Sequence, residues 1–270
     1  MDRVTLYRAP TTEADAGAIA EWLRPRIDAT VEVRDRFLSC YADGVSESEL
    51  DSEARQTESA GDLPEAFAEA RVLDPYGRET GNTMLGIVRY EERAIEDPER
   101  AGGVIYDGLQ VQEILGQRIP QSERNLGHLH VPLLDRVVGT WGDHDGRWHK
   151  RVNILGQPAL VSVPGLYEAP AKPEQYYKAQ QKHAMLSGDT PPREVLENEV
   201  EGEFLVAEDP RTTEALCGYV LQAYHYLATG EAFCDEEHCR LHNPHRQPGV
   251  VEAQLRDPEF CETHADLYAP

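Results

Sequence analysis

Apolar residues recur with two different spacings in the first third of the chain, and each spacing predicts a different kind of element. Alternating apolar and polar residues indicate strands, whereas apolar residues three or four positions apart indicate helices. The elements predicted here are strands over 4–7, 30–33, 84–90 and 103–106, and helices over 13–23 and 109–115. Thr12 is placed to cap the first helix and Pro25 to end it. Residues 42–66 are acidic and rich in serine, which predicts a solvated loop with one or two loose helical turns.

The middle of the chain is richer in strand patterns, and the remainder is richer in helices. Further strands are predicted over 128–134, 137–141, 149–155 and 159–163, with a turn over 142–146. The proline-rich stretch 164–173 interrupts this pattern, and helical patterns follow it. The best-formed predicted helix begins at Asp209-Pro210, runs to about Ala228 and stops at Gly230. No internal repeat is visible.

This order of elements predicts an α/β or α+β fold, in which a mixed sheet carries packed helices. With 270 residues the chain is long enough for one large domain or two small ones. We expect an N-terminal α/β region of unassigned role over 1–120 and a second region over 121–270.

The charge of the chain is strongly one-sided. Forty-nine acidic residues stand against 26 basic ones, which gives a formal net charge of -23. Lysine is scarce, and the four lysines are Lys150, Lys172, Lys178 and Lys182. This composition indicates the adaptation to molar salt that is typical of a halophile, because at such salt concentrations the Debye length falls to about 3 Å and self-repulsion is screened. An acidic surface for a basic partner is the weaker interpretation, since the charge is spread along the whole chain. Nucleic acid is not an expected partner, because its phosphates require basic patches.

The sequence predicts a cytoplasmic protein with no membrane partner. Residues 1–4 lack the apolar stretch of an export signal, and no apolar run approaches the length that spans a bilayer. In a reducing compartment a cysteine is more often a metal ligand than half of a disulfide. Cys40 and Cys217 stand alone in the sequence, and Cys217 is expected to be a small buried apolar residue in a helix.

The most specific chemical signal lies in the last forty residues. Cys234 and Cys239 form one pair, Cys261 and His264 form another, and twenty-one residues separate the two pairs. Two short turns that each offer two soft ligands are typical of a structural zinc site with tetrahedral geometry. Unrelated buried thiols beside a surface histidine are the alternative, although a phenylalanine precedes each pair. Three nearby histidines could replace one of the ligands: His238, His242 and His245.

Around this motif the chain resembles the archaemetzincins, a family of zinc metallopeptidases. Their pattern runs H-E-x-x-H-x-x-G-x-x-H, continues at once with C-x4-C-x-M, and later contains F-C-x-x-C. The resemblance covers roughly residues 126–270, places the motif glycine on Gly230 and puts His264 where the family has a fourth cysteine. Residues 153–166 resemble the family's strand that leads towards the active-site helix. The resemblance implies a metzincin-like C-terminal part with one structural zinc.

The catalytic half of the family pattern is missing. The positions of the three zinc-binding histidines hold Ala223, Leu227 and Phe233, the position of the general-base glutamate holds Tyr224, and the Met-turn position holds Leu241. Alanine, leucine and phenylalanine cannot bind zinc, and tyrosine with its usual pKa near 10 is a poor base. A second, catalytic zinc of the metzincin type is therefore not expected here.

A catalytic metal could have moved to other residues. His128 and His130 alternate along a predicted strand, so both side chains are expected on one face of it. The other candidates are His149, His225 and the carboxylates that accompany them, and the full group to consider is Asp143, His144, Asp145, His149, His225 and Glu231. The simpler interpretation is that the two strand histidines flank a sheet edge and that residues 143–145 form a solvated turn.

Two functional hypotheses follow from these residues. The first is a non-proteolytic zinc-stabilised protein that binds a peptide or protein in a cleft inherited from a peptidase. The second is an active zinc-dependent peptidase or other hydrolase that uses a relocated metal, with His128, His130, His149 and His225 as candidate catalytic residues. The number of metal ions per chain distinguishes the two.

Overall fold

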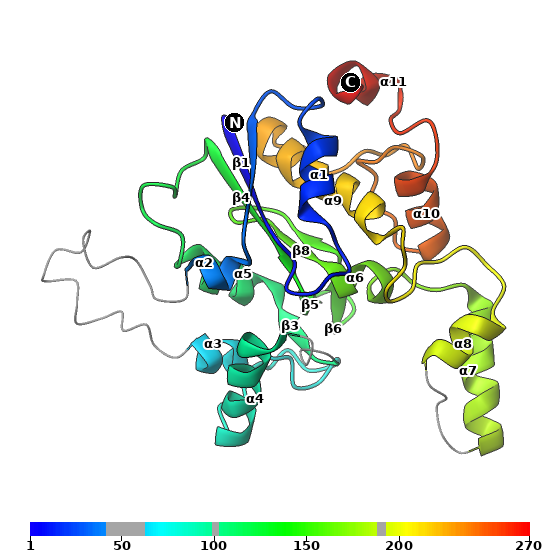
Figure 1. Cartoon of the computed structure of the whole chain (residues 1–270). Helices are drawn as coiled ribbons and strands as arrows, with labels where there is room; N and C mark the ends of the chain where they lie inside the picture. The colour runs from blue at the N-terminus through cyan, green and yellow to red at the C-terminus, as the bar shows by residue number, and fades with distance from the viewer. Residues whose placement is uncertain (42–62, 99–102, 188–192) are drawn as a thin grey trace, which may run out of the picture.

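The computed structural model describes residues 1–41, 63–98, 103–187 and 193–270, and a five-stranded sheet lies at its centre (Figure 1). The order of the strands is β2-β1-β4-β8-β7, in which β7 is antiparallel to β8 and the other neighbours are parallel. A second sheet has the order β3-β5-β6. The bounds are β1 (Arg3–Tyr7), β2 (Thr30–Arg34), β3 (Ile105–Asp107), β4 (His128–Leu134), β5 (Val137–Gly142), β6 (Arg147–Arg151), β7 (Asn153–Ile154) and β8 (Leu160–Ser162).

Helices cover both faces of the five-stranded sheet. α1 and α9 lie on one side of it, and α2 and α5 lie on the other (Figure 1). α7 and α8 pack on each other and project from the main body, whereas α10 packs on α9. The bounds are α1 (Ala16–Leu23), α2 (Phe37–Cys40), α3 (Leu63–Glu69), α4 (Leu85–Glu96), α5 (Gly108–Gly116), α6 (Val163–Glu168), α7 (Glu174–Ser187), α8 (Arg193–Glu199), α9 (Thr212–Thr229), α10 (Gln247–Leu255) and α11 (Glu262–Tyr268).

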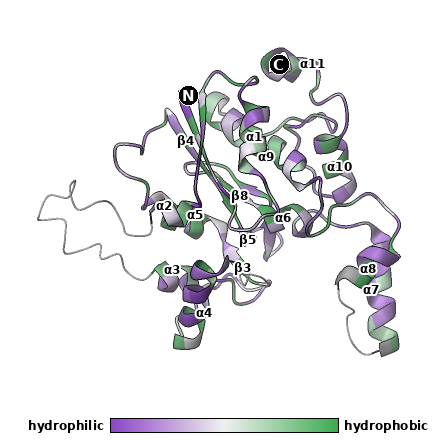
Figure 2. Cartoon of the chain, viewed as in Figure 1, coloured by the Kyte–Doolittle hydropathy of each residue, from purple (hydrophilic) through white to green (hydrophobic). Residues whose placement is uncertain are grey.

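The two faces of the central strands differ in chemistry. Successive side chains of a strand point to opposite faces. Leu6 and Leu129 belong to the apolar core that α1 and α9 cover, whereas Thr5 and His130 point to the other face and are also fully buried. Figure 2 shows hydrophobic colouring along the central strands and α9, and mixed or hydrophilic colouring on the peripheral helices α7 and α8. The sheet is therefore apolar towards α9, whereas its opposite face combines buried polar residues such as Thr5 and His130 with apolar ones such as Leu134 and Leu160.

Strand β1 occupies the point at which the order of the strands reverses. The chain passes from β1 through α1 to β2 on one side, and later returns to β1's other side as β4. Because β2, β1 and β4 are parallel, their carboxyl ends lie at the same edge of the sheet. In open α/β sheets this is where ligands bind.

The predicted class of a mixed sheet with packed helices is confirmed, as are most of the strands. Residues 84–90 are the exception, because the predicted strand is the first part of helix α4. Its apolar residues favoured a strand, but α4 packs on α3 and directs Glu91 into a buried ion pair with Arg71. Tertiary contacts here outweigh the local pattern.

The helix ends agree less well with the prediction than the helices themselves. Asp15 rather than Thr12 caps α1, and its carboxylate accepts from the N–H groups of Gly17 and Ala18. α9 begins at Thr212, three residues after the predicted cap Asp209, whose carboxylate accepts instead from the Arg211 backbone N–H. The predicted stop of α9 is confirmed, because Gly230 has a φ of 83° and caps the helix in the left-handed region.

The structure also bears on two boundaries that the sequence predicts, those of the acidic loop and of the N-terminal region. The predicted loop over 42–66 lies largely outside the described residues, and its last part, from residue 63, belongs to α3. The division between 1–120 and 121–270 does not separate two sheets, because β1 and β2 from the first region pair into one sheet with β4 from the second. Within the described residues, no helix is long and apolar enough to cross a membrane.

We expect Leu129→Ala to lower the free energy of unfolding by about 2–5 kcal/mol, because Leu129 is fully buried between the sheet and the helices. Leu126→Ala is the matched control, since Leu126 lies three residues earlier and is 79 % exposed, and it should change stability by less than about 0.5 kcal/mol. Chemical denaturation at one fixed high salt concentration measures both. Equal effects of the two substitutions would contradict the assigned orientation of β4.

Candidate functional site

The structure brings together the four residues that the cysteine pattern singles out. Cys234 and Cys239 lie in the loop that follows α9, while Cys261 precedes α11 and His264 lies in its first turn. The first loop folds back on itself, because the Cys234 N–H donates to the Leu241 carbonyl at 3.0 Å and the Cys239 N–H donates to the Glu236 carbonyl at 3.0 Å. Each pair of ligands therefore sits on its own tight turn. We call these four residues the Cys3His cluster.

The spacing of the four ligand atoms fits one small cation. All four lie within 4.8 Å of one another. The Sγ atoms of Cys234 and Cys261 are 3.8 Å apart, and His264 Nδ1 is 3.6 Å from Cys239 Sγ and 3.1 Å from Cys261 Sγ. A tetrahedral zinc with Zn–S near 2.3 Å and Zn–N near 2.0 Å separates its ligands by about 3.8 Å for two sulfurs and about 3.5 Å for sulfur and nitrogen. The cluster can therefore hold a metal ion.

When no cation is bound, burial disfavours the charged thiolate form of the cysteines. It raises the pKa of Cys234 to about 12 and also raises the pKa of Cys239, because a thiolate there would lose its hydration beside other thiols. Burial lowers the pKa of His264, which favours the neutral imidazole that binds metals. A divalent cation supplies the charge that three close thiolates need, so metal binding would displace their protons.

Buried side chains of the neighbouring helices hold the loop in place. Gln222 of α9 donates through Nε2 to the carbonyls of Arg240 and His242, at 3.0 and 2.8 Å, and Gln254 of α10 donates to the Arg240 carbonyl at 3.0 Å. His225, a candidate catalytic residue, hydrogen-bonds through Nδ1 to the Tyr268 hydroxyl at 2.8 Å. Its ring meets the ring of His264 edge to face at 5.3 Å. His225 therefore packs between α9 and α11 as a support of the cluster.

The three alternative histidine ligands do not join the four atoms. The described group around the cysteines consists of Cys234, Cys239, Cys261 and His264. His242 has a different partner, since its Nδ1 lies 2.9 Å from the Cys234 carbonyl oxygen and so closes the same loop. His238 is partly exposed and His245 is exposed.

The three residues that the resemblance to the peptidases would align with zinc-binding histidines lie in the second half of α9 and in the loop after it. Ala223 is fully buried in the apolar core, Leu227 packs partly buried against it, and Phe233 is exposed in the following loop. None of these side chains has an atom that binds zinc. Tyr224 is buried, which raises the pKa of its hydroxyl and makes it a still weaker base.

A second group of ligand atoms lies on the polar face of the sheet. Glu123, His128 and His130 each offer an atom within 4.8 Å of the others. The two histidines alternate on β4 as predicted, and their ring centres are 4.0 Å apart. We call these three residues the strand-histidine cluster.

The strand-histidine cluster already has protein partners for most of its polar atoms. Arg34 binds Glu123 with both terminal nitrogens, at 2.7 and 3.0 Å. His130 Nδ1 is 2.8 Å from the Tyr7 hydroxyl, and its Nε2 is 3.3 Å from the Glu123 carbonyl oxygen. His128 Nε2 lies 2.8 Å from the Thr5 hydroxyl. A guanidinium on the carboxylate repels a second cation, and His130, whose ring nitrogens are both engaged, would have to give up a hydrogen bond to bind one.

Comparison with known proteins supplies a family but no function. A model of a family of unknown function, DUF7001, matches residues 5–267. The chain belongs to DUF7001. No curated protein and no solved structure matches it. The chemistry of this DUF7001 protein therefore has to be argued from its own residues.

The remaining histidine candidates of the DUF7001 chain lie elsewhere. His149 is on β6, and its Nε2 is 2.9 Å from Asp145 Oδ1 at the exposed β5–β6 turn. His144 is exposed in the same turn, while Asp143 binds Arg78 at 3.2 Å. In the described part of the chain none of these residues, nor His225 or Glu231, belongs to either ligand group. The described residues therefore do not gather these side chains into one relocated site, in agreement with the simpler interpretation of their sequence pattern.

Sequence patterns missed a third site, which consists of buried charges at the end of β4. Asp135 and Arg136 directly follow the strand, and each is more than nine-tenths buried. Arg136 also lies 3.5 Å from Glu91, whose carboxylate accepts from the Tyr106 hydroxyl at 2.9 Å. An Asp-Arg pair after a strand does not indicate burial in a sequence, because aspartate and arginine are mostly exposed in folded proteins.

Acid should destabilise the protein partly through His130. Burial lowers the pKa of this residue to about 4, whereas an unfolded chain has a histidine pKa near 6.5. The stability it contributes is fully present above pH 6.5 and is lost as the pH falls from 6.5 to about 4, by at most roughly 3 kcal/mol. His130→Asn should flatten the decline of unfolding free energy over this range, as measured by denaturant titrations at several pH values.

His144→Asn is the control for this measurement, because the His144 side chain is exposed and pairs only with surface groups. It should leave the slope against pH unchanged. If His130→Asn and His144→Asn gave the same slope as the parent protein, neutral burial of His130 would be refuted.

Proposed function

We propose that this DUF7001 protein is a non-proteolytic binding protein whose C-terminal part is held by one structural Zn²⁺. The observation that carries the zinc site is the meeting of four soft ligand atoms within 4.8 Å at separations near those of tetrahedral zinc. Thiolate and imidazole together favour zinc over the hard cations Mg²⁺ and Ca²⁺, which prefer oxygen ligands.

The proposed zinc has a structural role. Three thiolates and one imidazole complete a four-coordinate shell, so no position is left for a water molecule that the ion could activate. The ion instead links the loop after α9 to the start of α11. Contacts that need no metal also join these segments: the Arg240 N–H donates to the Glu259 carbonyl at 2.9 Å, and the Arg240 guanidinium binds the Glu259 carboxylate at 3.0 Å.

The absence of proteolysis follows from the side chains at the end of α9. If the resemblance to the archaemetzincins holds, Ala223, Leu227 and Phe233 replace the ligands of a catalytic zinc, and Tyr224 replaces its base. Without proteolysis, the expected function is the binding of a peptide or another protein. The edge of the sheet at the carboxyl ends of its parallel strands is the natural place for it.

An active metal-dependent hydrolase is the second candidate, and one observation favours it. Glu123, His128 and His130 form a buried His/carboxylate group with ligand atoms within 4.8 Å of one another. The bidentate contact of Arg34 with Glu123 weighs against it, because a metal would have to displace that guanidinium or share its carboxylate. We therefore rank this function second.

Metal analysis tests the structural zinc directly. The parent protein, purified at high salt, should contain one zinc per chain, and Cys239→Ser should contain almost none. Loss of the ion should expose residues 234–268 first, seen as faster hydrogen exchange there, because zinc binding contributes free energy on the order of 10 kcal/mol in small zinc domains. Cys217→Ser is the matched control, since Cys217 is a buried thiol in α9 that lies outside the cluster. If the parent protein contained no metal and exchanged the amide hydrogens of residues 234–268 at the same rate as Cys239→Ser, the proposal would be refuted.

Substitution of the strand-histidine cluster separates the two functions. His128→Asn should leave the metal content at one zinc per chain, and neither this variant nor the parent should cleave peptides in molar salt. A second metal ion that disappears in His128→Asn, together with a peptidase activity that disappears with it, would instead establish the hydrolase.

A further inference from the structure

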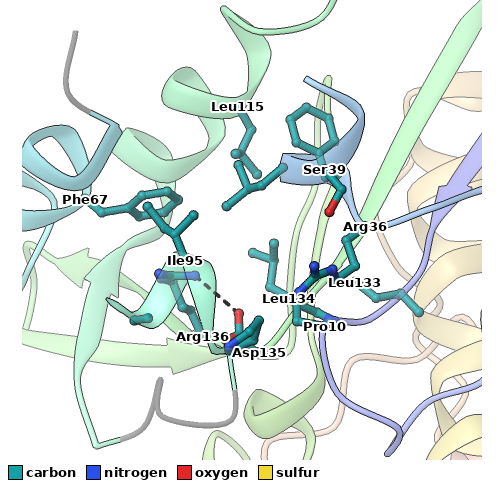
Figure 3. A pocket seen from close by; sticks show the side chains of 14 residues that line it. Pro10, Arg36, Ser39, Phe67, Ile95, Leu115, Leu133, Leu134, Asp135 and Arg136 are labelled. Atoms are coloured by element: carbon teal, nitrogen blue, oxygen red, sulfur yellow. Dashed lines mark hydrogen bonds and ion pairs between the residues drawn. The ribbon is translucent and has the colours of Figure 1, made fainter. Parts of the chain in front are cut away.

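A cavity at the carboxyl ends of the parallel strands is used by neither group of metal ligands. Its volume is about 170 Å³, and it lies between the ends of β1, β2 and β4 on one side and α4 and α5 on the other (Figure 3). Most of its wall is apolar. The apolar residues that line it include Phe37, Phe67, Ile95, Leu115, Leu133 and Leu134. An engineered apolar cavity of about 150 Å³ binds benzene, so this space holds one side chain of that size.

One end of the cavity is polar and carries buried atoms without partners. Asp135 and Arg136 are 8 % and 5 % exposed, and their only mutual hydrogen bond, from Arg136 Nη1 to Asp135 Oδ1, is 3.3 Å long (Figure 3). Asp135 Oδ2 and Arg136 Nε have no hydrogen-bond partner among the described residues, whereas Arg136 Nη2 lies 3.5 Å from Glu91 Oε2 in an ion pair. Orphaned acceptor and donor atoms in one buried wall are costly unless something else satisfies them.

Space adjoins this wall on both sides. A second cavity of about 200 Å³ shares Asp135 and Arg136 with the first, and its other lining residues include Thr11, Glu13 and Glu168. The two residues of this wall therefore border an apolar space on one side and a more polar space on the other.

A third charged side chain enters the apolar cavity from the opposite wall. Arg36 follows β2 and extends into the space towards Asp135 (Figure 3). Its charge acts on Asp135, since it helps to oppose the rise in the pKa of that carboxyl that burial causes. The Arg36 carbonyl accepts from the N–H groups of Ser39 and Cys40, but in the part of the chain that the structure describes no hydrogen bond or ion pair joins the Arg36 side chain to a protein group. A half-buried guanidinium with free donors is suited to bind a carboxylate.

These groups define the chemistry of a ligand. Arg136 already faces the carboxylates of Asp135 and Glu91, so an anion fits opposite the guanidinium of Arg36. A donor fits opposite Asp135 Oδ2, and an apolar group fits the remaining space. We propose that the cavity binds a free α-amino acid with a branched aliphatic or aromatic side chain. Its carboxylate meets the guanidinium of Arg36, its ammonium meets Asp135, and its side chain lies among Phe37, Phe67 and Leu115.

The same chemistry excludes close relatives of this ligand. A residue inside a peptide has neither charged group, and each end of a peptide has only one of them. An acidic amino acid would place a carboxylate in the apolar half of the cavity, where burial without a partner is unfavourable. The inference rests on the proposed function only in that the chain is a binding protein, and it makes the ligand smaller than a peptide.

Titration calorimetry on the zinc-containing full chain at high salt tests the ligand class. L-leucine or L-phenylalanine should bind with one site per chain. Glycine, D-leucine, N-acetyl-L-leucine, L-leucinamide and 4-methylpentanoate should bind at least about tenfold more weakly. Glycine lacks the apolar side chain, D-leucine has the opposite configuration at Cα, and each of the other three lacks one charged group. If no apolar amino acid bound at millimolar concentration, or if the capped and deaminated analogues bound equally well, the proposal would be overturned.

Two substitutions test the assigned contacts. Arg36→Gln and Asp135→Asn should each weaken L-leucine binding at least about tenfold, since each removes one charge-assisted hydrogen bond. Arg89→Gln is the matched control, because Arg89 is exposed on α4 and does not line the cavity. Unchanged affinity in both Arg36→Gln and Asp135→Asn would refute the site, and equal weakening by Arg89→Gln would reduce it to a general charge effect and refute it as well.

The outcome is independent of the zinc measurement. Zinc content and thermal midpoint of each variant show whether it is folded before affinity is measured. Amino-acid binding by a chain that contains no zinc would leave this inference standing while the zinc proposal failed. One zinc per chain without any amino-acid binding would leave the zinc proposal standing while this inference failed.

Discussion

The pairing of β1 with β2 on one side and β4 on the other is the constraint on which the other features depend. Five residues, Arg3–Tyr7, form parallel ladders with both neighbours, so the chain must leave β1 in one direction and return in the other. This reversal brings three carboxyl ends to one edge of the sheet. It also fixes which side chains of β4 point towards α9 and which point away. The cavity at Arg136, the strand-histidine cluster and the surface on which α9 lies are all consequences of it.

The structure shows which features could be predicted from local sequence and which could not. The Cys3His cluster was visible because its ligands come in two short pairs, and a turn of four or five residues is sufficient to aim each pair. The alternation at His128 and His130 was visible for the same reason, since it needs only the geometry of one strand. The strand predicted over 84–90 failed because residues distant in the sequence decide that segment: Glu91 of α4 is held by Arg71 and Tyr106.

The buried Asp135-Arg136 wall illustrates the limit of such prediction. Two charged residues after a strand are typical of a solvated turn, and nothing nearby in the sequence indicates that α4 and α2 cover them. Their burial arises from elements more than thirty residues away in the chain, which the topology of β1 and β4 brings to the same edge. Partners of this kind, rather than residue type, decide whether a charge is a surface group or part of a site.

The placement of arginine separates the three sites physically. In a chain with a net charge of -23, arginines that are mostly or wholly buried face carboxylates: Arg34 binds Glu123, and Arg26 and Arg240 both bind Glu259. Such partly buried pairs are screened little by salt, unlike the acidic surface. At the strand-histidine cluster an arginine therefore takes the place that a metal would need, whereas among the described residues no arginine binds the thiols of the Cys3His cluster. Arg36 differs from both, because its side chain extends towards Asp135 in the cavity without a described ion pair or hydrogen bond, and an anion brought by a ligand would complete it.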